Sequence, residues 1–234
     1  MEEIQNGCWW QCSAKARALG LPAGFLTFGP AFTNTDLPIE ALTLLPSGDC
    51  SRGLIGALAD NTAALPGLGV GLYLDDPFLN IERIARQFSD WSIAWVTNLP
   101  TIAQHDQQFR DVLRDVNFSV ENELQTLLTF RAHGFKTLAS VSNERQVASM
   151  SDYAPDAILV VQSTKDLQIS FPSLSARQAQ AHRVADALPD SLTDVSVLFQ
   201  LTSNETVRAD LAGVLRPTIF RMDGEWSGNM PAGY

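Results

Sequence analysis

Short apolar segments alternate with amphipathic segments along this chain. Apolar runs of about six residues are typical of parallel strands that are buried on both faces. Eight such runs are present, and they are Gly7–Cys12, Ala23–Gly29, Gly69–Leu74, Ile93–Asn98, Thr137–Ser142, Ala157–Gln162, Val195–Thr202 and Thr218–Met222. The segments between them have helical spacing, and they are Ser13–Leu19, Leu54–Ala64, Ile81–Phe88, Glu121–Ala132, Glu144–Met150, Ala176–Ala187 and Thr206–Val214.

Eight strands that alternate with helices predict a parallel α/β fold. Right-handed crossovers from each strand to the next would close the eight strands into a TIM (β/α)8 barrel. A doubly wound open sheet is the alternative, but it usually has fewer strands and a glycine-rich first turn. The first turn here, Trp9–Ser13, contains no glycine. We therefore predict a barrel.

The two ends of the sequence modify this barrel. Only six residues precede the first strand, and residues 223–234 are rich in Gly and Pro, which disfavour a helix. No linker divides the chain, so we expect one TIM-barrel domain over residues 1–234 with a truncated or missing last helix. The first and last strands would then be partly uncovered, and an exposed apolar patch usually becomes an interface. We expect a homo-oligomer that covers it.

Charge and composition exclude several classes of protein. The chain has 234 residues, a formal net charge of −10 and no run of Lys or Arg, which argues against nucleic-acid binding. No apolar run approaches the roughly 20 residues of a membrane span. The start, Met1–Gln5, is acidic and lacks the basic and then apolar pattern of a secretory signal. We expect a cytoplasmic protein with a small-molecule substrate and with neither nucleic-acid nor membrane partners.

Polar residues close several of the predicted strands, among them Asp76, Asn98 and Ser142. In parallel α/β folds such residues face the ligand-binding side. The three histidines lie in helical segments away from the strand ends, and no Gly-x-Ser-x-Gly, Walker or His-Glu-x-x-His motif is present. Any chemistry must therefore depend on carboxylates, amides, hydroxyls or Arg221.

Two aspartates near strand ends each have two interpretations. Asp49 follows Ser47 and Gly48, and it either caps the next helix or places a carboxylate on the barrel rim. Asp76 either belongs to a turn before a proline or joins Asp75 in supplying hard oxygen ligands for Mg²⁺.

Glu121 and Glu123 follow an additional helical stretch, Ile102–Asp115, inserted after the fourth strand. Glu121 falls in the first turn of a helix, where a carboxylate interacts favourably with the helix dipole whether or not it acts on a substrate. The two glutamates point about 200° apart on a helix, so at most one of them faces the barrel mouth. Trp9 and Trp10 are adjacent in a strand, so one faces the barrel interior, where it would make a pocket apolar.

Several short motifs share their order and spacing with a known family, and they are Leu44–Asp49, Asp76–Phe78, Asn98–Thr101, Phe109–Arg110, the Glu121-x-Glu123 pair and Leu127–Gly134. With these motifs the chain, from about Ser13 to Met222, resembles the phosphoenolpyruvate hydrolase-like family. These proteins are TIM barrels of the phosphoenolpyruvate/pyruvate-domain superfamily.

Three loops depart from the family pattern. Gly29–Asp36 replaces a stretch rich in Gly and Arg, and Gln162–Gln168 and Gln200–Asn204 replace two glycine-rich loops. Such glycines let backbone N–H groups approach an anion closely. Their loss makes a phosphate or phosphonate substrate doubtful and indicates a substrate more apolar than phosphoenolpyruvate.

The resemblance implies an enzyme of the lyase or hydrolase type that cleaves or forms a C–C or C–P bond through an enolate. Its substrate would be a small or medium carbonyl or carboxylate metabolite. Asp49 and Asp76 would hold Mg²⁺, the candidate cofactor, or orient the substrate. Glu121 would serve as acid or base, and Asn98 would donate to an oxyanion. The expected substrate-binding residues are Ser142, Gln162, Gln200, Arg221 and Trp10.

Two alternatives to this enzyme stay open. One is a cyclase of specialised metabolism with an apolar pocket. The other is a catalytically silent barrel that binds a ligand or a partner protein, which the missing glycines and the lack of an active-site histidine favour. Polar groups at the upper rim favour the enzyme, because barrels place their chemistry there.

Overall fold

The computed structural model describes residues 7–12, 17–18, 20–28, 50–60, 67–148, 150–167, 171–201, 215–219 and 222–223. Its strands are β1 (Gly7–Gln11), β2 (Gly24–Phe28), β3 (Gly69–Leu72), β4 (Trp95–Asn98), β5 (Lys136–Val141), β6 (Ala157–Val160), β7 (Ser196–Leu201), β8 (Leu215–Ile219) and β9 (Met222–Asp223). Its α-helices are α3 (Cys50–Asp60), α4 (Ile81–Asp90), α5 (Gln107–Asp115), α6 (Val120–Ala132), α7 (Thr164–Leu167) and α8 (Leu174–Asp186). The 3₁₀ turns are η1 (Ile102–Gln104), η2 (Glu144–Gln146), η3 (Met150–Asp152) and η4 (Asp190–Leu192).

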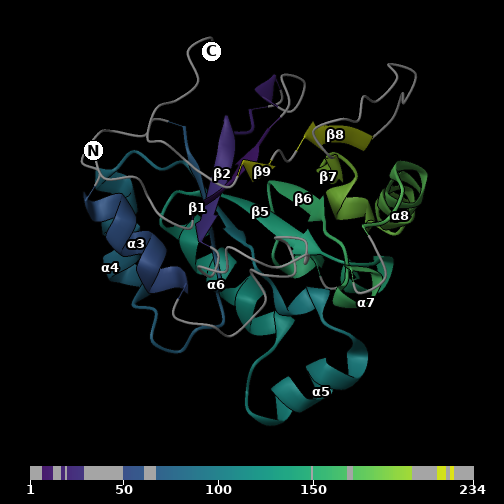
Figure 1. Ribbon diagram of the computed structural model, residues 1–234, viewed down its shortest axis with the longest axis horizontal. Helices are drawn as coiled ribbons and strands as arrows, with labels where there is room; N and C mark the ends of the chain where they lie inside the picture. Colours follow the sequence, from purple (N-terminus) through teal and green to yellow (C-terminus); the bar gives the residue numbers. More distant parts are fainter. Residues whose placement is uncertain are drawn as a thin grey trace.

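The strands form one curled sheet in the order β8-β7-β6-β5-β4-β3-β2-β1-β9. Neighbouring strands from β2 to β8 run parallel, whereas β1 runs antiparallel to both β2 and β9. Residues of β1 and β8 come within 8 Å of each other (Cα–Cα) although they are far apart in the sheet order. The sheet therefore curls as a partial TIM barrel. Figure 1 shows α5 set apart from this sheet, at one end of the molecule.

The parallel α/β fold is confirmed, but the prediction of a uniformly parallel sheet is wrong for the first strand. Residues 12–23 alone connect β1 to β2, and the Cys12 N–H donates to the Ala23 carbonyl at 2.8 Å. A short connection of this kind suits an antiparallel pair, because a parallel pair needs a crossover long enough for a helix. Within the described residues β1 and β8 are not hydrogen-bonded neighbours, so closure of a complete barrel stays a prediction.

Side-chain capping explains where several helices begin. Asn80, Ser119 and Ser173 accept hydrogen bonds from the backbone N–H groups of Arg83, Asn122 and Ala176 at the starts of α4, α6 and α8. Each cap satisfies a backbone donor that has no partner inside its own helix. None of the described helices is long and apolar enough to cross a membrane.

The predicted helix over Glu144–Met150 is wrong, because this segment forms only η2 and the start of η3. Asn143 Oδ1 accepts from the Arg145 N–H at 3.0 Å, and Gln146 Oε1 accepts from the Ser142 N–H at 2.6 Å. Local side-chain bonds of this kind compete with a regular helix. The predicted helix Thr206–Val214, most of Ser13–Leu19 and the chain after residue 223 lie outside the described residues.

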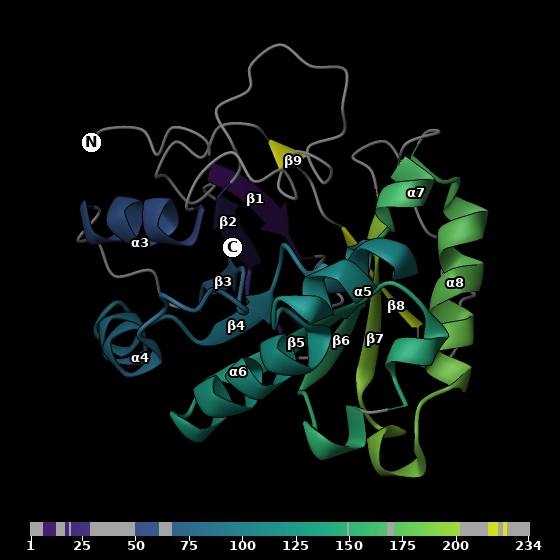
Figure 2. The same cartoon turned by 90° about the horizontal axis from the view of Figure 1, so that it is seen from below.

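The two faces of the sheet bury different layers. Helices lie along the outer face of the sheet (Figure 2). Residues such as Val70, Val96 and Phe199 belong to the apolar cluster between the sheet and these helices. The concave face has an apolar layer near the amino ends of the strands, formed by Phe25, Trp95, Leu138, Ala157 and Leu198. Two residues further along β2, β4, β5 and β7, the same face carries Thr27, Thr97, Ser140 and Gln200, all at most 1% exposed. The concave face is therefore apolar near the amino ends of the strands and carries these polar residues further along. At β6 it stays apolar through Leu159 and Val161.

Two glycines of β3 make room on the concave face. A Cβ atom on Gly69 would lie 2.3 Å from the ring of Phe25, and one on Gly71 would lie 2.3 Å from Thr27 Cγ2 and 2.7 Å from the Leu99 carbonyl oxygen. The close approach of β2 to β3 and of the Leu99 backbone to β3 therefore requires glycine at both positions.

Replacing Gly71 by Ala should destabilise the protein by about 1–3 kcal/mol, because the backbone at Leu99 must shift to admit the methyl group. Gly56→Ala in α3 is the matched control. A Cβ there meets no atom within 4 Å, so the better helix propensity of Ala should add up to about 1 kcal/mol. Urea unfolding of both variants tests this contrast, and a Gly71→Ala variant as stable as the wild type would contradict it.

Candidate functional site

A buried carboxyl group, that of Glu123, connects α6 to the end of β4. Its side chain is fully buried. Glu123 Oε2 accepts from Thr101 Oγ1 at 2.5 Å and from Asn98 Nδ2 at 3.1 Å, and Oε1 accepts from the Ile102 N–H at 2.9 Å. These bonds join the carboxyl end of β4, the start of η1 and the first turn of α6 into one unit.

Burial raises the pKa of Glu123 to about 8. The hydrogen bonds from Thr101, Ile102 and Asn98 lower this pKa, but the loss of solvation outweighs them. Burial likewise raises the pKa of Tyr73, and Glu123 is the first of the nearby charges that add to this effect. Glu123 therefore titrates near pH 8.

Asn98 uses its amide to support this network. Its Nδ2 donates to Thr101 Oγ1 at 3.1 Å as well as to Glu123, and its Oδ1 accepts from the Ser140 N–H at 2.7 Å. The side chain lies on the helix side of β4, opposite to Trp95 and Thr97 by strand alternation. Donation from Asn98 to an oxyanion would require these bonds to break.

The turn η1 is held over the end of β5 by one carbonyl group, that of Ala103. It accepts from Ser142 Oγ at 2.6 Å, from Gln146 Nε2 at 3.1 Å and from Arg110 Nη1 at 3.3 Å. Ser142, an expected substrate-binding residue, is thus 4% exposed and hydrogen-bonded to the backbone. Its position at the carboxyl edge agrees with the expectation, while its contact with a substrate stays a prediction.

Asp75 and Asp76 have separate partners. Asp76 Oδ1 accepts from the Phe78 N–H at 2.9 Å, which is the bond of a local turn. Asp75 Oδ2 accepts from the Ser119 N–H at 2.5 Å, just before α6, and burial raises the pKa of Asp75. Each carboxylate therefore has one oxygen committed to the backbone.

These carboxylates do not by themselves fit a resident Mg²⁺ ion. Among the described residues no three His, Cys, Asp or Glu side chains are grouped as metal ligands. The second predicted ligand, Asp49, lies outside the described residues, as does Arg221. Trp10 is described in β1, where its backbone is in register with Phe25 and Met222.

A cavity of about 410 Å³ lies between α5, the start of α6 and η2. It is at the carboxyl edge of β4 and β5, because η1 and α5 follow β4 and η2 follows β5. The charged residues that line it are Arg110, Arg114, Glu121, Glu144 and Arg145. We call it the rim pocket. Of the predicted catalytic residues, it contains Glu121, whereas Asp76 and Asn98 are not part of its lining.

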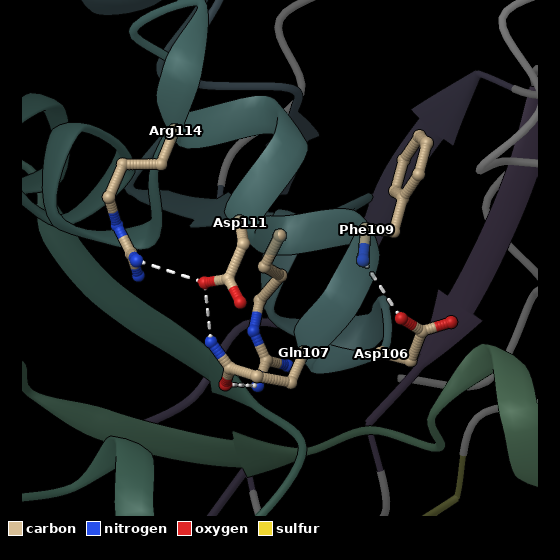
Figure 3. Close-up of polar contacts among 6 residues, drawn as sticks. Asp106, Gln107, Phe109, Asp111 and Arg114 are labelled. Carbon is tan, nitrogen blue, oxygen red and sulfur yellow. Dashed lines mark hydrogen bonds and ion pairs between the residues drawn. The ribbon is translucent and has the colours of Figure 1, made fainter.

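Arg110 is fixed in the rim pocket before any ligand binds. It donates from Nη1 to the His105 carbonyl at 2.5 Å and from Nη2 to Gln107 Oε1 at 2.8 Å. Burial lowers the pKa of Arg110, and nearby carboxylates, Glu121 among them, raise it. Arg114 forms an exposed ion pair with Asp111 at 3.0 Å (Figure 3). The pocket therefore combines one anchored cation with more exposed ones.

Helix α5 turns its polar side to the rim pocket and its apolar side to solvent. Gln107, Arg110 and Arg114 line the pocket at helical spacing. In Figure 3 the Phe109 side chain extends away from Asp111 and Arg114. Phe109, Val112 and Val116, which share the other side of the helix, are 46%, 55% and 58% exposed. The helix is thus held through its polar residues.

Sequence reasoning selected Glu121, which is exposed, and did not select Glu123, Thr101 or Gln104. The signal for Glu123 was present, because Leu127 and Phe130 follow it four and seven residues later and so share its helix face. That face is buried. The hydrogen bonds of Thr101 and Gln104 connect distant segments, so no local pattern indicates them.

The curled parallel sheet and the polar residues at its carboxyl edge define an α/β protein with a partial barrel and a rim site. The model of the family described as phosphoenolpyruvate hydrolase-like matches residues 57–200, more than half of the chain. The chain belongs to this family, which confirms the resemblance seen in the sequence.

Parts of the chain are also similar to individual proteins. Uncharacterized protein y4oT of Sinorhizobium fredii (strain NBRC 101917 / NGR234) is 29% identical over 104 residues, which cover 44% of this chain and 53% of that protein. The chain therefore spans about half the length of this relative. Nitroalkane oxidase from Streptomyces ansochromogenes is 12% identical with a TM-score of 0.30, over 58% of this chain and 43% of that one. This second likeness is too weak to bear on fold or function.

The pKa of Glu123 predicts a pH dependence of stability. Between about pH 5 and pH 8 the native state binds a proton at Glu123 that an unfolded glutamate, with its pKa near 4.3, has released. The free energy of unfolding should therefore fall as pH rises through this range, by up to about 1.4 kcal/mol per pH unit.

Urea unfolding between pH 5 and pH 8.5 measures this slope. Glu123→Gln should remove the contribution, whereas Glu121→Gln, at an exposed position in the same helix, should leave the slope as in the wild type. An identical slope in Glu123→Gln and the wild type would refute the assignment.

Proposed function

We propose that this chain is an enzyme of the lyase or hydrolase type that acts on a small or medium carbonyl or carboxylate metabolite through an enolate. We place it in the cytoplasm, as a homo-oligomer. Membership of the phosphoenolpyruvate hydrolase-like family supports the reaction class. The observation that carries the proposal is the rim pocket, where three arginines and Glu121 lie together at the carboxyl edge of the sheet.

The residues of the rim pocket suit a carboxylate substrate. Arginine binds carboxylates through two parallel charge-assisted hydrogen bonds, and Arg110 is already oriented by three acceptors. Arg145 contributes a second cation from η2. Glu121 can exchange a proton with the carbon next to the bound carbonyl group, and nearby guanidinium groups stabilise the negative charge that develops.

In this proposal Glu123 and Asn98 are positioning residues. They hold the start of η1 against α6, and η1 contributes Ile102 to the rim pocket. Asp76 remains a candidate for orienting the substrate through its second oxygen. The family resemblance alone implies that Asp49 would hold Mg²⁺ or orient the substrate.

A catalytically silent barrel is the second candidate. The amide of Asn98 is engaged in hydrogen bonds that hold the fold. Glu121 is exposed to solvent, whereas catalytic acids and bases usually lie in a cleft that shields them from water. The apolar layer around Phe25 and Trp95 is the feature that favours the remaining alternative, a cyclase with an apolar pocket.

Arg145→Gln and Glu121→Gln separate these functions. Binding of pyruvate and oxaloacetate, followed by calorimetry, should weaken about tenfold to a hundredfold in Arg145→Gln, because a charge-assisted hydrogen bond contributes about 1.5–3 kcal/mol. Glu121→Gln should retain binding but lose exchange of the pyruvate methyl protons with D₂O, observed by NMR. Arg83→Gln, at an exposed position of α4, is the matched control.

Two results would count against the enzyme. Unchanged binding in Arg145→Gln would remove the rim pocket as the substrate site. Binding of either compound without proton exchange in the wild-type protein would instead favour the silent barrel.

A further inference from the structure

Three buried glutamines lie at the carboxyl edge of the sheet, and none of them lines the rim pocket. Gln104, Gln162 and Gln200 are 2%, 1% and 1% exposed. Gln104 Nε2 donates to the Gln162 carbonyl at 3.0 Å, which places η1 against the end of β6. Gln200 lies in β7, one residue beyond the point where Phe199 is in register with Val160 of β6. The three side chains therefore belong to one region of the fold.

The orientation of Gln200 follows from the alternation of β7. Leu198 packs in the concave cluster, while Phe199 and Leu201 pack in the cluster under the helices. Gln200 therefore points to the concave side. On the helix side, Arg177 Nη1 donates to the Gln200 carbonyl. This bond fixes the backbone and leaves the side-chain amide unused.

Four amide atoms of these glutamines are buried without a hydrogen-bond partner among the described residues. They are Gln104 Oε1, Gln162 Nε2, Gln200 Nε2 and Gln200 Oε1. Buried polar atoms in native proteins are nearly always hydrogen-bonded, and an unpaired one lowers stability. A concentration of four such atoms in one region indicates that a ligand supplies the missing partners.

The chemistry of these atoms identifies the kind of ligand. Two Nε2 groups donate and two Oε1 atoms accept, so the ligand needs both an acceptor and a donor. The concave-face side chains at this end, Thr27, Thr97, Ser140 and Gln200, carry no charge. Burying a carboxylate or a phosphate there without a cation would be strongly unfavourable, whereas a neutral group would be well matched.

We propose that Gln104, Gln162 and Gln200 form a binding site for a neutral hydrogen-bonding group, such as the carboxamide or hydroxyl of a small molecule. This site goes beyond the proposed function, because the rim pocket holds an anion and the glutamine site does not. The chain would thus recognise a neutral polar group at a position where the family's glycine-rich loops have been replaced.

Gln200→Met and Gln162→Met test the site in two ways. Methionine has a similar volume but no amide. In the ligand-free protein these amides are buried and unpaired, so they lower the stability of the fold. Removing them should leave the urea midpoint of the ligand-free protein unchanged or raise it. A lower midpoint for both variants would show that the amides stabilise the fold, and it would overturn the proposal.

Binding is the second readout. Saturation-transfer NMR should detect acetamide and lactamide on the wild-type protein, and the signal should be lost in both variants. In Arg145→Gln, where anion binding at the rim pocket is weakened, acetate and lactate should give no saturation-transfer signal. No signal from either amide, or an equal signal from the carboxylates in that variant, would overturn the proposal.

Two controls make the result specific. Gln87→Met, in α4, removes an amide whose Oε1 is also buried and unpaired within the described residues, but it lies in the helix layer and should leave the amide signal intact. Glu121→Gln should also leave that signal intact. Failure of the enzyme proposal and failure of the glutamine site would therefore be seen in different variants.

Discussion

The fully buried carboxyl group of Glu123 determines how the carboxyl edge of the sheet is arranged. A glutamate in an apolar core is unfavourable unless its oxygens are hydrogen-bonded, and here Thr101, Asn98 and the Ile102 backbone supply the donors. The same bonds fix the path of the chain as it leaves β4. Helix α5, the rim pocket and the contacts of η1 with β5 all depend on that path. The geometry of the candidate site is thus determined by buried hydrogen bonds of Glu123, which does not itself line the rim pocket.

The two layers of the concave face divide the interior by polarity. The apolar layer near the amino ends packs the sheet, as in barrels generally. The polar layer near the carboxyl ends includes Thr97 and Ser140, whose hydroxyls are 3.2 Å apart. A buried polar layer is less favourable for folding than an apolar one, so its presence at this end is consistent with selection for ligand contact. This division agrees with a site at the carboxyl edge in either functional interpretation.

Local patterns in the sequence were sufficient to predict the parallel strands and most of the helices between them. The parallel strands from β2 to β8 were located to within a few residues, because continuous apolar runs leave few other arrangements. The antiparallel β1 was missed because strand direction depends on the connection, and its apolar pattern is the same in both directions. The Glu144–Met150 helix failed because side chains at Asn143 and Gln146 took backbone partners, which is a local competition that helix periodicity does not report.

The candidate site was less predictable than the fold. Topology alone places Ser142, Gln162 and Gln200 at the carboxyl edge of the sheet, whereas their contact with a substrate stays a prediction. The choice between Glu121 and Glu123 depended on which helix face was buried, and the dipole argument, which applies to both residues of the first turn, carries no information on burial. The bonds of Gln104 to Gln162 and of Thr101 to Glu123 join segments far apart in sequence. Such pairings follow from packing and could not be derived from spacing.

The Ala103 carbonyl has a further consequence for how this protein tolerates sequence change. One oxygen with two lone pairs is shared by donors from the end of β5, from η2 and from α5. When one donor is lost, the other two can move closer, so substitutions in these three segments should be non-additive. Substitutions in the three segments are therefore expected to be correlated during evolution, although the segments are separated along the chain.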